Sequence, residues 1–435
     1  MVRSTVARVD LDALKNNFAA IRQFLAGPRR DGASPPPSAP SRRGGSSDPP
    51  AAGPEIIAVV KANAYGHGAA PVALALEQAG VTLLACADIE EGVVLRRAGV
   101  RVPILVFGAL SVSDLDGLFE FALTPTISTP SAARAVQAAA ARRQTTIGYH
   151  LKIDTGMNRL GFRHDNLRRT LPQVLASANL RLDAVYTHFA SADVPESPLL
   201  EQQRQNYEAA WRVVDDLLCH DGAASSVART LSGPRGEPDL ATRSGSSRSQ
   251  SRDDTARPTA FIRHAANSAA TLRDSRTWYD AVRPGLLLYG IVPPPLASTI
   301  PLQPVMSLTS RVVAVKGIRP GEGVGYGWRF TADAPRTIAV VPAGYADGLD
   351  TRLSGRGHVL VRGKRVPIVG AVSMDMITID VTGLDDVQPG DEVVILGTQG
   401  EESWQQIDAR ELAASVGMIP WEVVCRLGSR IERVY

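Results

Sequence analysis

The sequence predicts a parallel (β/α)8 barrel followed by a mostly β domain, and two patterns carry this prediction. Over residues 11–290, short apolar runs alternate with amphipathic stretches of helical period. From residue 302 onward, apolar runs are separated mainly by glycine and proline turns, as in a β-rich domain. For the first half, an open doubly wound sheet is the structural alternative.

The barrel is predicted to span residues 11–301, with an amphipathic helix over 11–25 ahead of its strands. Its eight strands are predicted at residues 56–62, 82–88, 103–109, 123–128, 149–154, 182–189, 261–268 and 281–290. Helices between them are predicted at residues 70–79, 89–98, 131–143, 165–178 and 199–219.

A second, β-rich domain is predicted over residues 302–435. Its strands are expected within residues 307–318, 337–344, 357–370, 376–383 and 391–397, where β-branched residues recur between turns. The N-terminal residues 1–10, which contain STVARVD, are a candidate for one more strand of this domain.

Two segments depart from both patterns. Residues 27–54 and 221–258 are rich in Pro, Gly, Ser and Arg and poor in large apolar side chains. Such segments bury too little surface to offset the entropy lost on ordering. We therefore predict that they are disordered insertions in surface loops.

Composition narrows the function classes. A formal net charge of +3 gives no case for a nucleic-acid or membrane partner. No window reaches the length of apolar chain that crosses a membrane, and no signal sequence stands at the N-terminus, so a cytoplasmic protein is expected. Cys86, Cys219 and Cys425 are far apart, which argues against a disulfide framework and against a metal site.

Chemically capable residues follow the predicted strands at their carboxyl ends, where barrel enzymes place their sites. The chain has five lysines against forty-two arginines, and two of the five, Lys61 and Lys152, lie at such ends. The same rule selects Arg159, His188, Asn267, Ser268, Arg283 and Gly285.

A buried lysine at a strand end suits attack on an aldehyde, because burial lowers the ammonium pKa and frees the amine. The small residues of HAANS (264–268) and RPG (283–285) would let backbone N–H groups approach a phosphate. Taken singly, these features are more often a paired lysine, a core histidine and ordinary turns. Their joint occurrence favours a phosphate-bearing aldehyde ligand.

These motifs resemble those of the alanine racemase family, which are pyridoxal-phosphate enzymes of fold type III. The matching segments are AVVKANAYGHG (58–68), LKIDTGMNRLGF (151–162), YTHFASAD (186–193), ANSAA (266–270), RPGLLLYG (283–290), VGYG (324–327), GYADG (344–348) and SMDM (373–376). They keep their order over nearly the whole chain outside the two insertions.

The resemblance implies an isomerase that uses pyridoxal 5'-phosphate to interconvert L-alanine and D-alanine, supplying D-alanine for peptidoglycan. Inverting a stereocentre needs one acid/base group on each face. Lys61, which would carry the cofactor, serves one face, and Tyr326 from the partner subunit of a homodimer serves the other. Tyrosine has a pKa near 10, so Tyr326 needs support, for which His188 is the candidate.

The remaining roles also follow from the resemblance. The phosphate would be held by Tyr65, Asn267, Ser268, Gly285 and Leu286. The ring would be contacted by Arg159, by His188 and, at its nitrogen, by Arg283. Lys152 matches a position that is often carbamylated. The substrate would meet Arg159 and Met374, with Tyr345 at the entrance.

Three positions depart from the family pattern. Trp421 stands where a tyrosine usually meets the phosphate, and indole has a single N–H donor in place of a hydroxyl. Thr351 and Ala371 stand where many members carry arginine. Two alternatives stay open: a broad-specificity amino-acid racemase, because sequence alone does not measure which side chains the pocket excludes, and a non-catalytic pyridoxal-phosphate-binding protein. Arg283 disfavours a decarboxylase of the same fold.

Overall fold

The computed structural model describes residues 4–27, 53–108, 110, 115–230, 261–400 and 404–435. Within these residues, eight parallel strands close into a barrel, because β5 pairs with β6 and β10 pairs with β2. The barrel strands are β2 (Glu55–Val59), β3 (Leu83–Cys86), β4 (Ile104–Val106), β5 (Thr124–Ile127), β6 (Ile147–Asp154), β8 (Leu180–Tyr186), β9 (Ile262–Asn267) and β10 (Ala281–Arg283). The predicted barrel is confirmed, and the open sheet is excluded.

The barrel interior has an apolar side and a polar side. Alternate residues of β2, β3, β4 and β10 form an apolar cluster of Ile57, Val59, Ala85, Leu105 and Ala281. On the other side, β6, β8, β9 and β10 bury polar side chains, namely His150, Lys152, Tyr186, His264 and Arg283. Because side chains alternate along a strand, the inward set is fixed by each strand's register. The polar side of the interior therefore holds the ionisable groups that an active site needs.

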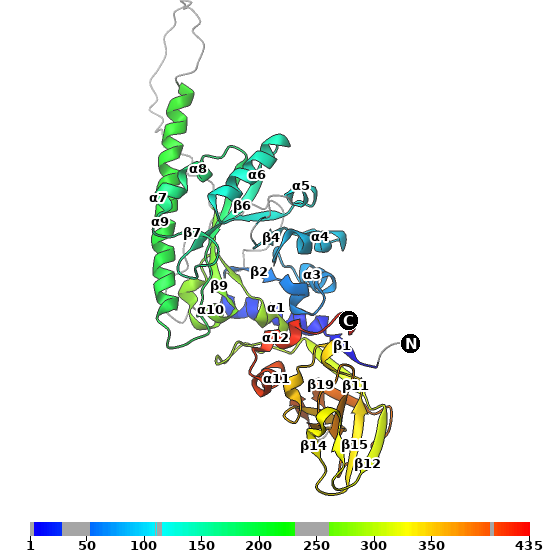
Figure 1. Cartoon of the computed structure of the whole chain (residues 1–435). Coiled ribbons are helices and arrows are strands. Elements are labelled where there is room, and N and C mark those ends of the chain that lie inside the picture. Colours follow the sequence, from blue (N-terminus) through cyan, green and yellow to red (C-terminus); the bar gives the residue numbers. More distant parts are fainter. Residues whose placement is uncertain (1–3, 28–52, 109, 111–114, 231–260, 401–403) are drawn as a thin grey trace, which may run out of the picture.

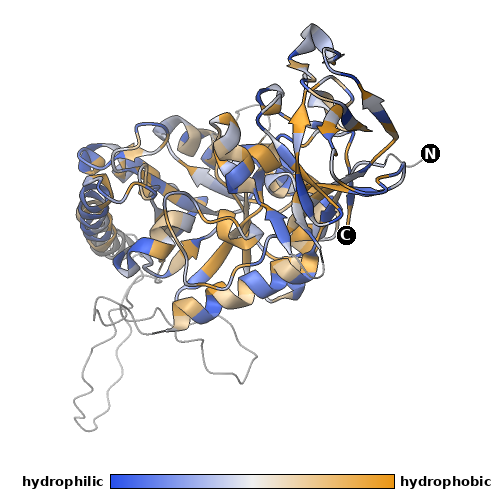
Figure 2. Ribbon diagram, turned by 90° about the horizontal axis from the view of Figure 1, so that it is seen from below, coloured by the Kyte–Doolittle hydropathy of each residue, from blue (hydrophilic) through white to orange (hydrophobic). Residues whose placement is uncertain are grey.

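Helices surround the barrel (Figure 1). Their bounds are α1 (Leu11–Ala26), α3 (Ala69–Gln78), α4 (Ile89–Arg97), α5 (Asp116–Glu120), α6 (Pro130–Arg142), α7 (Leu167–Thr170), α8 (Pro172–Leu175), α9 (Leu199–Thr230) and α10 (Ser268–Arg273). Figure 2 shows largely apolar strands inside the barrel and polar residues on the helices around them. This is the distribution expected of helices that each bury one face.

Three predicted elements differ from the observed ones. The helix predicted at residues 165–178 is two short helices, because Pro172 has no N–H to donate and begins the second one. The strand predicted at 281–290 ends at Arg283, before Pro284. Helix α9 runs to Thr230, so residues 221–230 of the second predicted insertion are helical. The rest of that insertion, and residues 28–52 of the first, lie outside the described residues.

The second half of the chain is β-rich, as predicted. Among the described residues, nine strands of this half and β1 from the N-terminal segment form one sheet in the order β12-β15-β18-β17-β16-β19-β11-β1-β21, with β20 on β19. Their bounds are β1 (Val6–Val9), β11 (Met306–Arg311), β12 (Ala314–Ile318), β15 (Arg336–Val341), β16 (His358–Val361), β17 (Lys364–Val369), β18 (Ile377–Asp380), β19 (Glu392–Gln399), β20 (Gln405–Ile407) and β21 (Glu432–Val434). Two short strands, β13 (Gly323–Val324) and β14 (Phe330–Thr331), form a hairpin beside it.

The N-terminal segment joins this sheet. Strand β1 pairs antiparallel with β11 and parallel with β21. This N-terminal strand therefore belongs to the β-rich sheet, and the barrel follows it in sequence. Two helices, α11 (Ala409–Val416) and α12 (Pro420–Cys425), lie between the sheet and the barrel (Figure 1). The domain boundary between residues 301 and 302 stays a prediction.

Two further findings concern the described residues only. None of the helices there is long and apolar enough to cross a membrane. No group of three or more His, Cys, Asp or Glu side chains in the described ranges is arranged to hold a metal ion.

Candidate active site

Lys61 lies just beyond the carboxyl end of β2, at the mouth of the barrel. Burial lowers the pKa of its ammonium group, and the nearby Arg159 and Arg283 lower it further, while Glu91 and Cys425 oppose this shift. Lys61 is therefore a more available nucleophile than an exposed lysine. These four neighbours come from four separate parts of the sequence.

The segment after Lys61 has an unusual backbone. Ala62, Asn63, Ala64 and Tyr65 have φ values of 54°, 52°, 53° and 52°, so the segment α2 (Lys61–Tyr65) is a left-handed turn. This conformation costs an L-residue roughly 1–2 kcal/mol and is ordinarily adopted by single residues. Four in succession persist only where neighbouring groups hold them.

Hydrogen bonds hold the later part of this turn. The side-chain oxygen of Asn63 accepts from the Ala69 N–H at 2.7 Å. The Nδ1 of buried His67 lies 3.0 Å from the carbonyl oxygen of Ala64 and 2.9 Å from that of Tyr65. Arg433, near the C-terminus, donates to the Gly66 carbonyl oxygen at 3.1 Å. The β-rich half thus contacts the turn that follows Lys61.

Lys152 is buried in the barrel, 6 % exposed, near the end of β6. Burial lowers its pKa to about 8, and the nearby charges of Arg159 and Arg283 act in the same direction. Its ammonium nitrogen lies 5.7 Å from the centre of the Tyr186 ring. A substantial fraction of Lys152 is therefore a neutral amine slightly above neutral pH.

Arg283 is held by a chain of buried groups. It is 3 % exposed and donates to Nδ1 of His264 at 2.7 Å and to the carbonyl oxygen of Thr187 at 2.7 Å. Because guanidinium can only donate, His264 carries its proton on Nε2 and donates to Nδ1 of His150, 3.0 Å away. Burial lowers the pKa of His150 to about 4 and holds that of His264 well below its ordinary value, so both are neutral. The chain fixes the orientation of Arg283.

His188 follows β8 and faces the same cationic set. Burial, and then Arg283 and Lys152, hold the pKa of His188 well below its ordinary value. Its Nδ1 lies 3.4 Å from Nη2 of Arg283. His188 is thus a neutral ring among cations. Lys61, Lys152, Arg159, His188 and Arg283, all predicted from sequence, are together at the barrel mouth.

A small polar cradle lies beside them. Ser268 begins α10, and its Oγ accepts from the Gly285 N–H at 3.0 Å. A Cβ at Gly285 would come within 2.6 Å of the Tyr65 hydroxyl, so a larger residue there would force the Tyr65 side chain to move. Asn267 caps α10 by accepting from the Ala270 N–H at 3.0 Å. Leu286 opens a short 3-10 helix after Gly285. The hydroxyls and N–H groups of this cradle suit a phosphate.

Trp421 lies on the first turn of α12 and is half-buried. Farther along the same helix, Val424 and Cys425 pack directly against Gly66, where a Cβ would fall 2.2 Å from the Val424 carbonyl oxygen. Helix α12 therefore abuts the turn that follows Lys61. A contact between Trp421 and a phosphate stays a prediction.

Tyr326, Tyr345 and Met374 are placed differently. They are 78 %, 44 % and 51 % exposed, on loops of the β-rich half. The amides of Tyr345 and Ala346 donate to the carbonyl oxygens of Ser373 and Met374, which joins two of these loops. Among the described residues, the structure does not bring these three side chains into the barrel mouth of the same chain.

The two positions that lack arginine lie near these loops. Thr351 is exposed in a short 3-10 helix after the Tyr345 loop. Ala371 lies beside Gly325, where an added Cβ would fall 3.5 Å from the Ala371 amide nitrogen. Arg430 pairs with Asp347 at 3.3 Å and with Asp375 at 2.6 Å, so a guanidinium from the C-terminal segment supports both loops.

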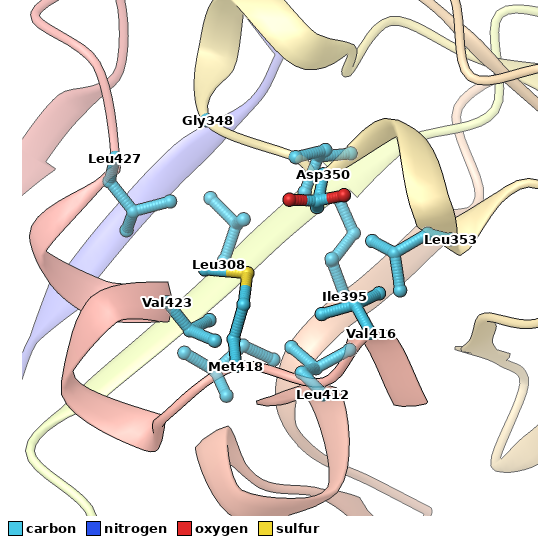
Figure 3. A pocket seen from close by; sticks show the side chains of 12 residues that line it. Leu308, Gly348, Asp350, Leu353, Ile395, Leu412, Val416, Met418, Val423 and Leu427 are labelled. Carbon is cyan, nitrogen blue, oxygen red and sulfur yellow. The ribbon is translucent and has the colours of Figure 1, made fainter. Parts of the chain in front are cut away.

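An apolar cavity lies elsewhere, under the sheet of the β-rich half (Figure 3). Its volume is about 30 Å³, and Leu308, Ile395 and Leu412 are among its lining residues. Asp350 is the charged group at its wall, and Arg352 and Arg426 already bind its carboxylate at 2.9 Å each. This cavity holds little more than one water and offers no free polar group for chemistry.

Sequence reasoning missed several residues of the site. His150 and His264 sit in strand runs that were recognised, and only their inward register marks them. Glu91 follows Asp88 in the D-x-x-E pattern of a helix cap, which conceals its contact with the Lys61 turn. Cys425 is far in sequence from the other two cysteines, and no local pattern marks it as a neighbour of Lys61.

Comparison with known proteins gives two family matches. Residues 49–233 and 247–293 match the family described as "Alanine racemase, N-terminal domain", and residues 305–435 match "Alanine racemase, C-terminal domain". The alanine racemase of Halothermothrix orenii is 34% identical over 100% of this chain and 97% of its own length. That of Carboxydothermus hydrogenoformans is 38% identical over 88% of this chain and 92% of its own.

Solved structures agree in fold. The alanine racemase of Streptomyces lavendulae has a TM-score of 0.78 at 31% identity, covering 100% of this chain and 97% of that one. The Bacillus anthracis enzyme with bound L-Ala-P has a TM-score of 0.74 at 31% identity, covering 100% and 95%. The Bartonella henselae enzyme, with covalently bound pyridoxal phosphate, has a TM-score of 0.76 at 24% identity, covering 99% of each chain, and shows the fold alone.

Proposed function

The chain belongs to the alanine racemase family, and we propose that it interconverts L-alanine and D-alanine with pyridoxal 5'-phosphate as cofactor. Family membership makes it an isomerase. The observation that carries the proposal is Lys61, a half-buried amine at the barrel mouth whose pKa is lowered by desolvation and by the nearby Arg159 and Arg283. The cellular role proposed is the supply of D-alanine for peptidoglycan.

The residues present fit this cofactor. Ser268, Gly285 and Tyr65 form a cradle that a Cβ at Gly285 would fill, and Asn267 and Leu286 flank it. Lys61, Lys152, Arg159 and Arg283 make the mouth cationic, which suits a ligand with a phosphate and a phenolic oxygen. Trp421 is proposed to donate its indole N–H to the phosphate.

When bound, pyridoxal phosphate supplies the electron sink that makes the α-proton of an amino acid removable. Lys61 is proposed to hold the cofactor and to move the proton at Cα on one face. Arg159 is proposed to orient the substrate carboxylate. Arg283 would face the ring nitrogen, and although burial lowers the pKa of Arg283 to about 10, it keeps its proton at neutral pH. The protein therefore gives that nitrogen no proton, which favours quick return of the proton to Cα.

Lys152 is proposed to be carbamylated. Its neutral amine, available because its pKa is about 8, adds to the carbon of carbon dioxide and releases one proton. The resulting anion would pair with Arg159 and hold it toward the site. It would also replace one of the clustered positive charges with a negative one.

The second face is proposed to be served by Tyr326 of the partner subunit. Tyr326, Tyr345 and Met374 form an exposed group with apolar and aromatic character, which is typical of an interface. A homodimer that places this group over the neighbouring barrel mouth would complete each site. His188 is proposed to lie against the cofactor ring and to support Tyr326.

The experiment that tests this function is racemisation of L-alanine by the purified protein with added pyridoxal phosphate. D-alanine is measured, with L-serine, L-lysine and L-arginine in parallel. Strong D-alanine formation with little turnover of the others is expected. Fast turnover of the large substrates would instead make it a broad-specificity racemase. No racemisation, despite a cofactor absorbance that is lost on Lys61→Ala, would leave a binding protein.

A further inference from the structure

The Glu91 side chain does not make the helix-capping hydrogen bond that its sequence position predicts. In the D-x-x-E pattern of a capped helix, the glutamate returns to the backbone of the capping residue. Here Asp88 caps α4 alone, its Oδ1 accepting from the Glu91 N–H at 2.8 Å. The Glu91 carboxylate instead accepts from the Ala62 N–H at 2.6 Å and from the Ala87 N–H at 2.7 Å. One side chain thus joins the ends of β2 and β3.

This bridge acts on the backbone of Lys61 itself. On one side of Lys61, the Val60 N–H donates to the Ala85 carbonyl oxygen at 2.8 Å, as part of the barrel. On the other side, the Ala62 amide is bound by Glu91. Ala62 is also the first residue with a left-handed backbone, at φ 54°. Lys61 is therefore fixed between a barrel hydrogen bond and the Glu91 carboxylate.

We propose that Glu91 is a positioning residue for Lys61: its carboxylate holds the first residue of the left-handed turn and so aims the Lys61 amine across the barrel mouth. The inference rests on the proposed function, in which Lys61 carries the cofactor. Asn63, His67 and Arg433 hold the turn farther along, whereas Glu91 acts at the residue directly after Lys61.

Charge gives Glu91 a second effect on the same group. Arg159 and Arg283 lower the pKa of Lys61, and the Glu91 carboxylate raises it. Removing this charge should move Lys61 further toward the neutral amine. The pH dependence of cofactor capture therefore reports the Glu91 charge, whereas exchange of the Ala62 amide reports the hydrogen bond that holds the turn.

The variants are Glu91→Ala, Glu91→Gln and the matched control Glu90→Gln. Glu90 is the preceding residue of α4 and is exposed. Three quantities are measured on the full chain: hydrogen exchange of the Ala62 amide without cofactor, the pH dependence of pyridoxal phosphate capture followed by absorbance, and kcat and KM for alanine. Thermal unfolding is recorded for each variant.

In Glu91→Ala, we expect the Ala62 amide to exchange at least about tenfold faster and kcat to fall about 10- to 100-fold, with KM nearly unchanged. In Glu91→Gln, which keeps the shape of the side chain, the midpoint of capture should shift to lower pH by about half a unit. Glu90→Gln should behave as the unaltered protein in all three.

Unchanged amide exchange in Glu91→Ala together with an unchanged capture midpoint in Glu91→Gln, with only a lower unfolding temperature in either variant, would overturn the proposal. If Glu91→Ala fails to fold, Glu91→Gln still decides it. Exchange and capture need no substrate. Absence of alanine turnover by the unaltered protein would therefore refute the proposed function while the role of Glu91 could still be judged.

Discussion

The proposed site residues of the barrel mouth are buried, whereas those on the loops of the β-rich half are exposed. At the mouth, Lys152 and Arg283 are almost completely buried, and buried histidines and strand ends fix their positions. On the loops, Tyr326 and Met374 project into solvent. The mouth is organised by the chain itself, whereas the loops present side chains without packing them. The difference supports the proposal that each active site combines the barrel mouth of one subunit with these loops of its partner.

The largest expected effect tests directly whether Lys61 of one subunit and Tyr326 of its partner form one active site. Lys61→Ala and Tyr326→Phe should each lower racemisation by about a thousandfold or more, because each removes one proton-transferring group. Mixing the two variants under conditions that exchange subunits should restore about one quarter of the unaltered activity, since half the dimers then contain one intact site. The assay is D-alanine formation.

The mixed sample would contradict the shared site if its activity stayed as low as that of each variant alone. If Tyr326 served the barrel of its own chain, every site of a mixed dimer would lack one group and activity would stay low. Each variant alone, carried through the same exchange, is the control.

A smaller effect is expected in the cradle of the barrel mouth. Gly285→Ala places a Cβ within 2.6 Å of the Tyr65 hydroxyl, so that hydroxyl must move. Pyridoxal phosphate should bind about 10- to 100-fold more weakly, measured by fluorescence titration. Gly317→Ala, in β12 of the other half, meets only the Arg336 carbonyl oxygen at 3.9 Å and is the control. Equal affinities would show that the cradle does not hold the phosphate.

Acid should destabilise the protein through the buried histidine of the barrel and not through the exposed histidine of the β-rich half. Burial lowers the pKa of His150 from 6.5 to about 4, so between these values the unfolded chain binds more protons than the folded one. The free energy of unfolding should therefore fall as the pH drops from 6.5 to 4, by about 1 kcal/mol per pH unit for this histidine.

Urea unfolding from pH 7 to 5 measures this dependence. His150→Gln should weaken it, because the titrating group is gone. His358→Gln changes an exposed residue at the start of β16 and should leave the pH dependence as it was. Identical slopes in both variants would mean that His150 does not contribute.

The smallest expected effect concerns Trp421. Trp421→Tyr replaces an indole N–H with a hydroxyl that both donates and accepts, and cofactor affinity should rise by about three- to tenfold. Titration of the cofactor-free protein with pyridoxal phosphate measures this change. Weaker binding would show that the helix α12 has adapted to the larger ring.

Much of this molecule could be predicted from sequence, because strand ends in a parallel barrel meet at one rim. Lys61, Lys152, Arg159, His188 and Arg283 were selected by that rule alone, and the structure brings them together. The helix predicted over 165–178 was wrong, because the periodic pattern of apolar residues continued through Pro172. Periodicity reports which face is buried and does not report where a hydrogen bond is missing.

The left-handed turn was beyond sequence reasoning. Ala62, Ala64 and Tyr65 have no intrinsic preference for positive φ. Their conformation is imposed by distant groups, among them Glu91 from the next barrel unit and Arg433 from the C-terminus. Neither contact can be seen in a local pattern, because each depends on how separate elements are packed.

The sequence by itself determined the alternation of strands and helices, the β-rich second half, and the residue types at each strand end, because these follow from local periodicity and turn chemistry. Only the tertiary structure decided the closure of the barrel, the tautomers along Arg283, His264 and His150, and the exposure of Tyr326. These depend on which groups are left facing one another, or facing solvent, once elements far apart in the chain have packed.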